Sequence, residues 1–209
     1  VDPVYEAQAG EKETDFRSFL LKAKAANPDA IVLSGLGDET VRALKQSYEV
    51  GIPKSVARVA NSVASKVEVP TNAGKAAVGV SYAAAFAASD KRPIAKKFVK
   101  KIKDKYGVVP GHDFSQMQDL LDMLRPALEK AQLKFSGNLA ADRNQVRDSI
   151  ASITNFTGLA SGPIGFCAAG SPECRDGNKT PVMIEYTKGG KNFKTKVAGT
   201  VTFNPSAGL

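Results

Sequence analysis

The feature that most constrains the fold is a regular alternation of short apolar segments with amphipathic ones in the first half of the chain. Residues 30–33 form a continuous apolar run with the length of a buried parallel strand, and residues 56–59 and 78–82 are predicted as the next two strands. Between the first two runs, Val41, Leu44 and Tyr48 follow the spacing of one helix face. Strand, helix and strand at intervals of about 25 residues predict an α/β fold, a parallel sheet with helices on both faces.

The start of the chain adds one strand and one helix to this pattern. The strand is predicted near residues 4–7. The helix ends at Asn27-Pro28, because proline disfavours helical backbone in the residue before it. Asp38 is predicted to cap the helix that follows residues 30–33, and Gly51 to end it. The apolar face of the first helix is Phe16, Phe19, Leu20 and Ala23.

The second half of the chain predicts helices first and strands later. Pro126 should kink or interrupt the second of these helices, and Asp142 is a candidate cap for the third. The linker Lys188-Gly189-Gly190-Lys191 between the last two strands is typical of a hairpin. The predicted helices are 93–106, 115–131 and 143–153, and the predicted strands are 164–166, 182–187 and 193–197.

The net charge of +8, from 29 basic and 21 acidic residues, is concentrated in the segment 91–106. Within it, Ile94, Phe98, Ile102 and Tyr106 recur every fourth residue, as on one stripe of a helix. The basic residues therefore cover the outer face of an amphipathic helix, and we expect that face to be solvated. No aromatic–basic interleaving or zinc-finger spacing accompanies it, so a nucleic-acid partner is not expected. The basic residues are Lys91, Arg92, Lys96, Lys97, Lys100, Lys101, Lys103 and Lys105.

Few residues suit catalysis, metal binding or a membrane span. His112 is the single histidine, follows Pro110-Gly111 in a predicted loop, and is expected at the surface. Cys167 and Cys174 lack the C-x-x-C spacing, so a local disulfide in an oxidising compartment is favoured over two reduced thiols. No apolar run approaches the roughly 18 residues of a membrane span. The sequence therefore predicts no catalytic residue, metal site or cofactor.

The loop Ser34-Gly35-Leu36-Gly37-Asp38 is the most informative short segment. It follows a predicted buried strand and opens a helix, so its backbone N–H groups could face an anionic ligand. Thr40 stands where a dinucleotide fingerprint needs its third glycine, so a nucleotide site is not indicated. Two interpretations stay open, a ligand-contact loop at the carboxyl end of a strand and a plain tight turn.

An ordered set of segments resembles the branched-chain amino-acid-binding proteins, which are type I periplasmic solute-binding proteins of ABC transporters. The resemblance spans nearly the whole chain, to about Val197. Its segments are Thr14-Asp15-Phe16, Leu20–Lys24 with Ala25–Ile31, Ala43-Leu44-Lys45-Gln46 with Val50-Gly51-Ile52, Phe98–Lys101 with Lys105-Tyr106-Gly107, Ala127–Ala131, and Phe156-Thr157-Gly158 with Gly162–Phe166.

The resemblance implies a Venus flytrap, in which two doubly wound α/β lobes close on a ligand in the cleft between them. Residues 1–85 would be the remainder of lobe two, 86–166 the returning part of lobe one, and 167–209 the C-terminal crossing segment and hairpin. It implies an incomplete chain, with the first part of lobe one expected before Val1 and a signal peptide removed. It also implies a periplasmic location, a membrane permease as partner, and a monomer when full length.

Only some of the ligand-contact residues of the family have counterparts in this sequence. The resemblance implies ligand contacts at Ser34, Gly35, Leu36 and Gly37, at Ala60, Asn61 and Ser62, and at Gln118. The family places an aromatic residue at Leu36, an acid for the ligand ammonium near Ala60, and often a tyrosine at Gln118. An ammonium without its carboxylate would be costly to bury. We therefore expect an apolar or aromatic carboxylate rather than a plain amino acid, with neutral hydrogen bonds from Asn61 and Ser62.

Three other functions remain as alternatives. The same fold could serve as a ligand-sensing regulatory domain. A small thiol-dependent α/β enzyme would use Cys167 or Cys174, and rapid alkylation of a reactive thiolate would reveal it. A nucleic-acid-binding protein would use the lysine-rich helix, and its affinity would fall steeply with salt.

Overall fold

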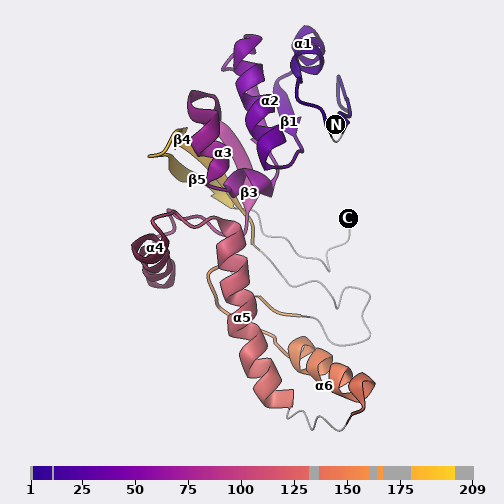
Figure 1. The fold of residues 1–209 in the computed structure, drawn as a ribbon, viewed down its shortest axis with the longest axis vertical. Helices are drawn as coiled ribbons and strands as arrows, with labels where there is room; N and C mark the ends of the chain where they lie inside the picture. The colour runs from indigo at the N-terminus through magenta and orange to yellow at the C-terminus, as the bar shows by residue number, and fades with distance from the viewer. Residues whose placement is uncertain (1, 11, 132–136, 161–163, 167–179, 201–209) are drawn as a thin grey trace.

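The computed structural model describes residues 2–10, 12–131, 137–160, 164–166 and 180–200. Its centre is a five-stranded mixed sheet in the order β1-β2-β3-β4-β5, with helices beside it and a helical extension at one end (Figure 1). The strands are β1 (Ala30–Leu33), β2 (Ala57–Ala60), β3 (Val80–Ala84), β4 (Val182–Lys188) and β5 (Lys194–Thr200). The helices are α1 (Arg17–Ala25), α2 (Gly37–Glu49), α3 (Glu68–Ala73), α4 (Pro93–Tyr106), α5 (His112–Ala131) and α6 (Leu139–Ala151), with 3-10 turns η1 (Ser62–Ser65) and η2 (Gly74–Ala77).

Both halves of the chain contribute to the sheet. β1, β2 and β3 are parallel, with Leu33 opposite Ala60 and Ala60 opposite Tyr82. The β4–β5 hairpin comes from the far end of the sequence, and β4 pairs antiparallel with β3, so that Ile184 lies opposite Tyr82. A mixed sheet of this kind confirms the predicted α/β class, and the hairpin supplies its antiparallel edge.

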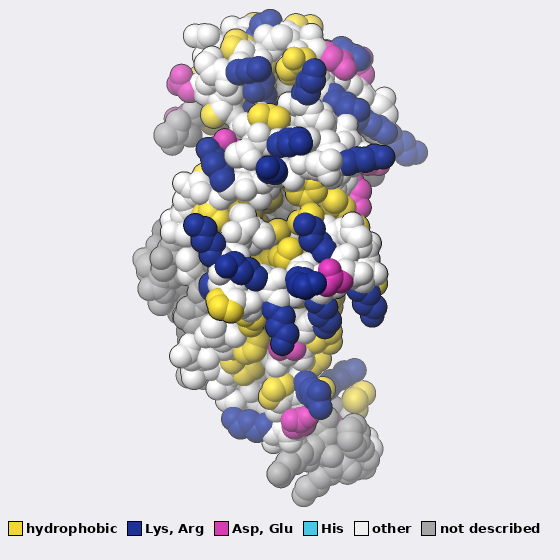
Figure 2. Space-filling view, turned by 90° about the vertical axis from the view of Figure 1, so that its left-hand side faces the viewer, with side chains coloured by type: hydrophobic (Ala, Val, Ile, Leu, Met, Phe, Trp, Pro, Cys, Tyr) yellow, Lys and Arg dark blue, Asp and Glu magenta, His cyan; other side chains and the backbone are white. Residues whose placement is uncertain are grey.

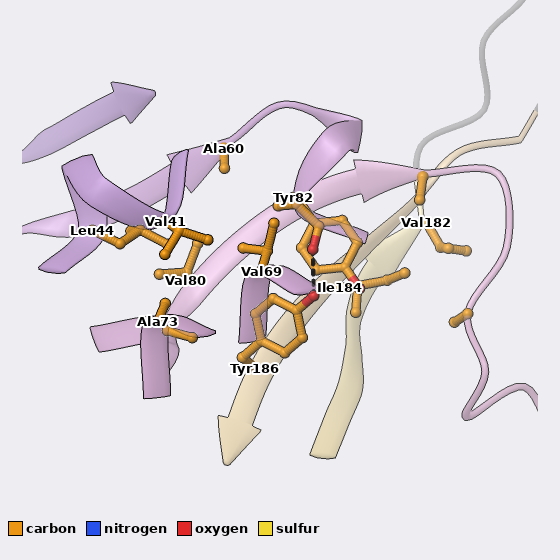
Figure 3. Packing of buried hydrophobic residues seen from close by; sticks show 14 residues of the cluster. Val41, Leu44, Ala60, Val69, Ala73, Val80, Tyr82, Val182, Ile184 and Tyr186 are labelled. Atoms are coloured by element: carbon orange, nitrogen blue, oxygen red, sulfur yellow. Dashed lines mark hydrogen bonds between the residues drawn. The ribbon is translucent and has the colours of Figure 1, made fainter. Parts of the chain in front are cut away.

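One face of the sheet forms the main core, because side chains alternate across a strand. Figure 3 shows Tyr82, Ile184 and Tyr186 packed on this face against Val69 of α3, and α2 adds Val41 and Leu44. The tyrosine hydroxyls are hydrogen-bonded to each other, and that of Tyr186 also donates to the carbonyl of Ala64. These bonds satisfy polar groups that burial would otherwise leave unpaired.

The other face is not covered by the helices that the structure describes. Val32 of β1 points to that face and is 73% exposed, and Ala83 of β3 is exposed as well. α2 and α3 lie on the core face, and α1 packs against α2. The predicted helices on both faces are therefore not found in these residues, where the strands alternate buried and exposed positions instead of being buried throughout.

A second, smaller core lies beyond β3. It joins Phe86 to Ala95, Phe98 and Ile102 of α4 and to Leu159. The rings of Phe86 and Phe98 meet edge to face at 5.8 Å between centroids. The long helix α5 extends away from the sheet, and α6 packs along it (Figure 1). α6 has no buried residue, so this end of the molecule contributes little to either core.

Most predicted elements are found, and several details differ. β1 and α4 have the predicted bounds, and β2 and β3 are shifted by one or two residues. Residues 4–7 form no strand, and Ile164 makes only an isolated bridge to Phe156. α5 begins three residues earlier than predicted and continues through Pro126. Pro126 is exposed, so water can bond the carbonyl that it leaves without a partner.

The two predicted helix caps are wrong. α2 begins at Gly37, and Glu39 rather than Asp38 satisfies its start by accepting a bond from the N–H of Leu36 at 2.8 Å. α6 begins at Leu139, and Asn138 rather than Asp142 caps it by accepting from the N–H of Ala141 at 3.1 Å. A helix start contains several polar residues, and the backbone conformation decides which of them is placed to cap it.

Candidate functional site

The candidate site is the edge of the sheet where the parallel strands β1 and β2 end. β1 leads into Ser34, Gly35 and Leu36, and β2 leads into Asn61 and Ser62. Parallel strands bring their carboxyl ends to the same edge, which is where open α/β sheets bind ligands. The predicted ligand residues on these two loops therefore lie side by side, as the strand pattern indicated.

Asn61 ties the two loops together. Its backbone N–H donates to the carbonyl of Leu33 at 3.2 Å, and its side-chain Nδ2 donates to the carbonyl of Gly35 at 3.1 Å. Because the Gly35 oxygen only accepts, the Asn61 amide nitrogen must face it, and Oδ1 points the other way. Oδ1 is buried and has no protein partner among the described residues. Asn61 thus holds the loop after β1 in place.

Leu36 is the large apolar group of this edge. Its side chain is 69% exposed, whereas Ala60 beneath the loops is buried. Ser34 is exposed and Ser62 is half-buried. The edge therefore offers an exposed apolar side chain next to neutral hydrogen-bonding groups, and the β2 loop contributes no charge to it.

The start of α2 carries its own carboxylate. Glu39 Oε2 accepts from the Leu36 N–H, and the Thr40 hydroxyl donates to the Gly35 carbonyl at 3.3 Å. A carboxylate at a helix N-terminus is stabilised by the helix dipole and occupies the place that an anionic ligand would take. This contact disfavours an anionic ligand at the backbone N–H groups of the loop.

Gln118 lies apart from the two loops. It is on α5, where its Nε2 donates to Asp122 Oδ1 at 2.9 Å along the helix. The start of α5 contacts η1, the turn that follows Asn61, but Gln118 is one and a half turns further along. The structure therefore brings Ser34–Gly37 and Ala60–Ser62 together and places Gln118 on a separate element.

A small cavity next to η1 is lined by polar residues that the sequence did not place together. Its volume is about 20 Å³, enough for one water molecule, and Ser65, Tyr82, Phe86, His112 and Thr195 are among its lining residues. Ser65 Oγ and His112 Nδ1 are both buried and without a protein partner in the described residues. No local signal could have paired them, because Ser65 and His112 lie on elements far apart in the sequence.

His112 is buried rather than at the surface as predicted. It is 9% exposed, because the first turn of α5 packs against η1 instead of forming a loop. Burial lowers the pKa of His112 below its ordinary value, the Lys66 cation also lowers it, and Asp113 raises it. His112 Nε2 lies 2.9 Å from Asp113 Oδ1. Its Nδ1 is buried and has no protein partner among the described residues.

Comparison with known proteins identifies the family of the chain. The family model described as periplasmic binding protein matches residues 2–173. The chain belongs to the periplasmic binding protein family. The mixed sheet agrees with the type I fold of these binding proteins, and the resemblance read from the sequence is confirmed. No curated protein matches the chain by sequence.

Solved structures of periplasmic binding proteins share the fold. A leucine binding protein from Thermotoga maritima is 26% identical, with a TM-score of 0.74 over 94% of this chain and 50% of its own. A Rhodopseudomonas palustris solute binding protein in complex with 4-hydroxybenzoate is 18% identical, with a TM-score of 0.75 over 97% of this chain and 53% of its own. A branched-chain amino acid transporter substrate binding protein from Streptococcus pneumoniae in complex with isoleucine is 21% identical, with a TM-score of 0.70 over 93% of this chain and 50% of its own. The chain spans about half the length of these binding proteins.

The remaining predictions concern the two cysteines, a membrane span and a metal site. Cys167 and Cys174 lie outside the described residues, as do the ends of the predicted crossing segment. Within the described ranges, no helix has the length and apolar character of a membrane span. No group of three metal-ligating side chains is found in that part of the chain either.

Proposed function

We propose that the protein is the extracytoplasmic solute-binding component of an ABC importer, and that it binds a small organic acid with an apolar or aromatic body. Family membership supports the solute-binding role, and the edge formed by the β1 and β2 loops supports the choice of ligand. The proposal includes a periplasmic location, a membrane permease that receives the solute, a monomeric state and no chemical step on the ligand.

The proposed lobes follow the order of the chain. Residues 1–85 belong to lobe two, residues 86–166 to lobe one, and residues 167–209 return to lobe two through the hairpin. The pairing of β4 with β3 supports this return, and the separate core around Phe86 and α4 supports a boundary after β3. Closure would be a hinge motion that the ligand stabilises by contacting both lobes.

The observation that carries the ligand choice is the neutral composition of the β2 loop. Ala60 is buried and Asn61 Nδ2 is used on the Gly35 carbonyl, so this loop offers no carboxylate to an ammonium group. The exposed Leu36 side chain stands beside it and can bury apolar surface of a ligand. Related folds bind both leucine and benzoates, so these side chains, not the fold, must discriminate between the two classes.

The charge at the start of α2 suggests how the ligand is oriented. Glu39 and Asp38 place carboxylates in the first turn of this helix. A ligand carboxylate directed at that turn would meet like charge, which costs free energy in a partly dehydrated cleft. The apolar end of the ligand therefore faces Leu36, and the carboxylate points away from α2.

A thermal-shift screen of the intact protein tests this proposal. The panel contains benzoate, 4-hydroxybenzoate, an aliphatic carboxylate, leucine and isoleucine. At a hundredfold excess over Kd, a true ligand should raise Tm by roughly 5–10 °C. A shift with the carboxylates and none with the amino acids is expected. A shift with leucine or isoleucine alone would contradict the ligand choice and keep the solute-binding role.

Leu36→Ala tests whether this edge contacts the ligand. Loss of its apolar contact should cost about 1–2 kcal/mol of binding, roughly a tenfold rise in Kd by isothermal titration calorimetry. Leu21→Ala on α1 is the matched control, because Leu21 is also exposed, at 51%, and lies away from the loops. Equal affinities of the two variants would place the binding site elsewhere.

A further inference from the structure

The outer face of α4 carries a charge pattern that solute binding does not use. Ala95, Phe98 and Ile102 turn toward the second core. The opposite side of the helix consists of exposed lysines, and Figure 2 shows basic side chains spread over this face of the molecule with few acidic ones among them. The exposed lysines of the helix are Lys96, Lys97, Lys100, Lys101, Lys103 and Lys105.

Repulsion between the clustered lysines destabilises α4. Asp104 is the one acidic residue within α4, and its carboxylate pairs with Lys100 at 2.6 Å. The remaining lysines of α4 make no salt bridge within the described residues. Lysines four positions apart repel each other, as Lys97 and Lys101 do. An anionic surface laid against α4 would offset this repulsion.

Two exposed apolar side chains stand at the borders of the lysine face. Ile94, in the first turn, is 44% exposed, and Tyr106, in the last turn, is 57% exposed. Both were predicted to lie on the buried stripe, but by helical spacing they flank it on opposite sides. Lys105 Nζ lies 5.2 Å from the centre of the Tyr106 ring. Exposed apolar side chains beside clustered lysines suit a membrane surface, where tyrosine is enriched and lysine meets anionic headgroups.

We propose that the lysine face of α4 binds the anionic headgroups of a phospholipid membrane. Lysine suits this partner because it is a hydrated point charge that needs no fixed geometry, whereas defined phosphate or base recognition favours arginine. Arg92, which directly precedes α4, is already held by Asp90 and the Leu159 carbonyl. This surface would concentrate the protein at the membrane, and it is separate from the β1 and β2 loops.

Sedimentation of the intact protein with lipid vesicles tests the proposal. The vesicles contain equal parts of phosphatidylglycerol and phosphatidylcholine, or phosphatidylcholine alone, at low salt and at about 0.5 M salt, where charges are screened within a few ångströms. Binding is expected to the anionic vesicles at low salt only. Failure to bind them would overturn the proposal whatever the result of the solute screen.

Two matched variants separate the helix from the overall charge. The first replaces Lys96, Lys97, Lys100 and Lys101 by Gln, and the second replaces the exposed Lys22, Lys45, Lys54 and Lys75 on other elements. Each lowers the net charge from +8 to +4. Because a lysine near an anionic membrane contributes about fivefold to binding, the first variant should lose well over tenfold in partition coefficient and the second much less.

Three results would contradict the proposal. An equal loss in both variants would show that overall charge drives binding. Binding to a short DNA duplex but not to vesicles would assign the face to nucleic acid, and binding to an acidic polypeptide alone would assign it to a protein partner. Circular dichroism of the α4 variant, with the helix content of the unchanged protein, confirms that a loss of binding is not a loss of fold.

Discussion

At the scale of single residues, the surroundings of His112 make stability depend on pH. Its imidazole is buried between η1 and the start of α5, and the charged groups nearest to it are Asp113 and Lys66. Burial lowers its pKa in the folded protein below the 6.5 of an unperturbed histidine. The unfolded chain therefore binds the proton more readily, and stability falls as the pH drops below about 6.5 toward the folded pKa.

His112→Gln should flatten this dependence, because glutamine does not titrate. We expect the Tm of the unchanged protein to fall between pH 7.5 and 5.5 by more than the Tm of the variant, as measured by differential scanning calorimetry. Asp113→Asn is a useful companion, because it removes the carboxylate that raises the His112 pKa and should steepen the fall. Equal slopes in all three proteins would show that His112 does not titrate in this range.

At the scale of elements, Asp119 joins α5 to the segment that passes beneath α4. Its side chain is almost fully buried and accepts from the N–H groups of Leu159 at 2.6 Å and Ala160 at 2.7 Å. Gly158 permits this approach, because a Cβ there would lie 2.2 Å from Asp119 Oδ1. Two charge-assisted bonds therefore depend on one carboxylate.

Asp119→Asn should destabilise the protein by about 2–4 kcal/mol, because one N–H would face the new amide donor instead of an acceptor. The free energy of unfolding in urea measures the loss. Asp122→Asn is the control on the same helix, since Asp122 is exposed and its replacement can still accept from Gln118. The control should change stability by less than about 0.5 kcal/mol. Similar losses in both variants would contradict the role of Asp119.

Elements were predictable where a local signal decides them. The run Ala30–Leu33 and the helix Pro93–Tyr106 have the predicted bounds, since an apolar run or a helical stripe with proline at its first position is visible in the sequence. The caps of α2 and α6 depend on backbone angles at Leu36 and Asn138, which composition does not reveal. The strand expected at 164–166 failed for a related reason, because a strand needs a neighbouring strand, and among the described residues this segment makes only an isolated bridge between Ile164 and Phe156 and one bond from Phe166 to Ile153.

The candidate site likewise combines an arrangement that the sequence predicted with contacts that it did not. Side chains after β1 and β2 were expected at one edge, and the parallel pairing of Leu33 with Ala60 brings them there. The contact of Asn61 with Gly35 and the buried Ser65 and His112 side chains beside one cavity arise from packing between distant segments. Such contacts follow from tertiary structure and have no signature in a single sequence.

At the scale of the whole molecule, the two cores should set local stability. α2 buries Val41 and Leu44 in the main core, α4 buries Phe98 and Ile102 in the second, and α6 buries nothing. Local opening costs least where few apolar contacts are lost. Stability should therefore decrease from the sheet toward the end formed by α5 and α6.

Hydrogen exchange followed by mass spectrometry tests this gradient. Amides of α6 should exchange fastest, those of α4 more slowly, and those of α2 most slowly. The comparison of α4 with α6 is the internal control, because both are helices with highly charged, exposed faces and only α4 contributes to a core. Protection of α6 equal to that of α2 would mean that the cores do not set the order.

The close passage of Gly111 over Ser65 gives the molecule a mechanical link. A Cβ at position 111 would lie 2.6 Å from the Ser65 carbonyl oxygen, so the backbones touch with no side chain between them. Such a contact transmits displacement directly, as a rigid joint does, because no flexible side chain can absorb it. A displacement of Gly111, which immediately precedes α5, would therefore be passed to η1, whose first residue, Ser62, borders the candidate ligand edge. Movement of the long helix would then change the position of the β2 loop at that edge.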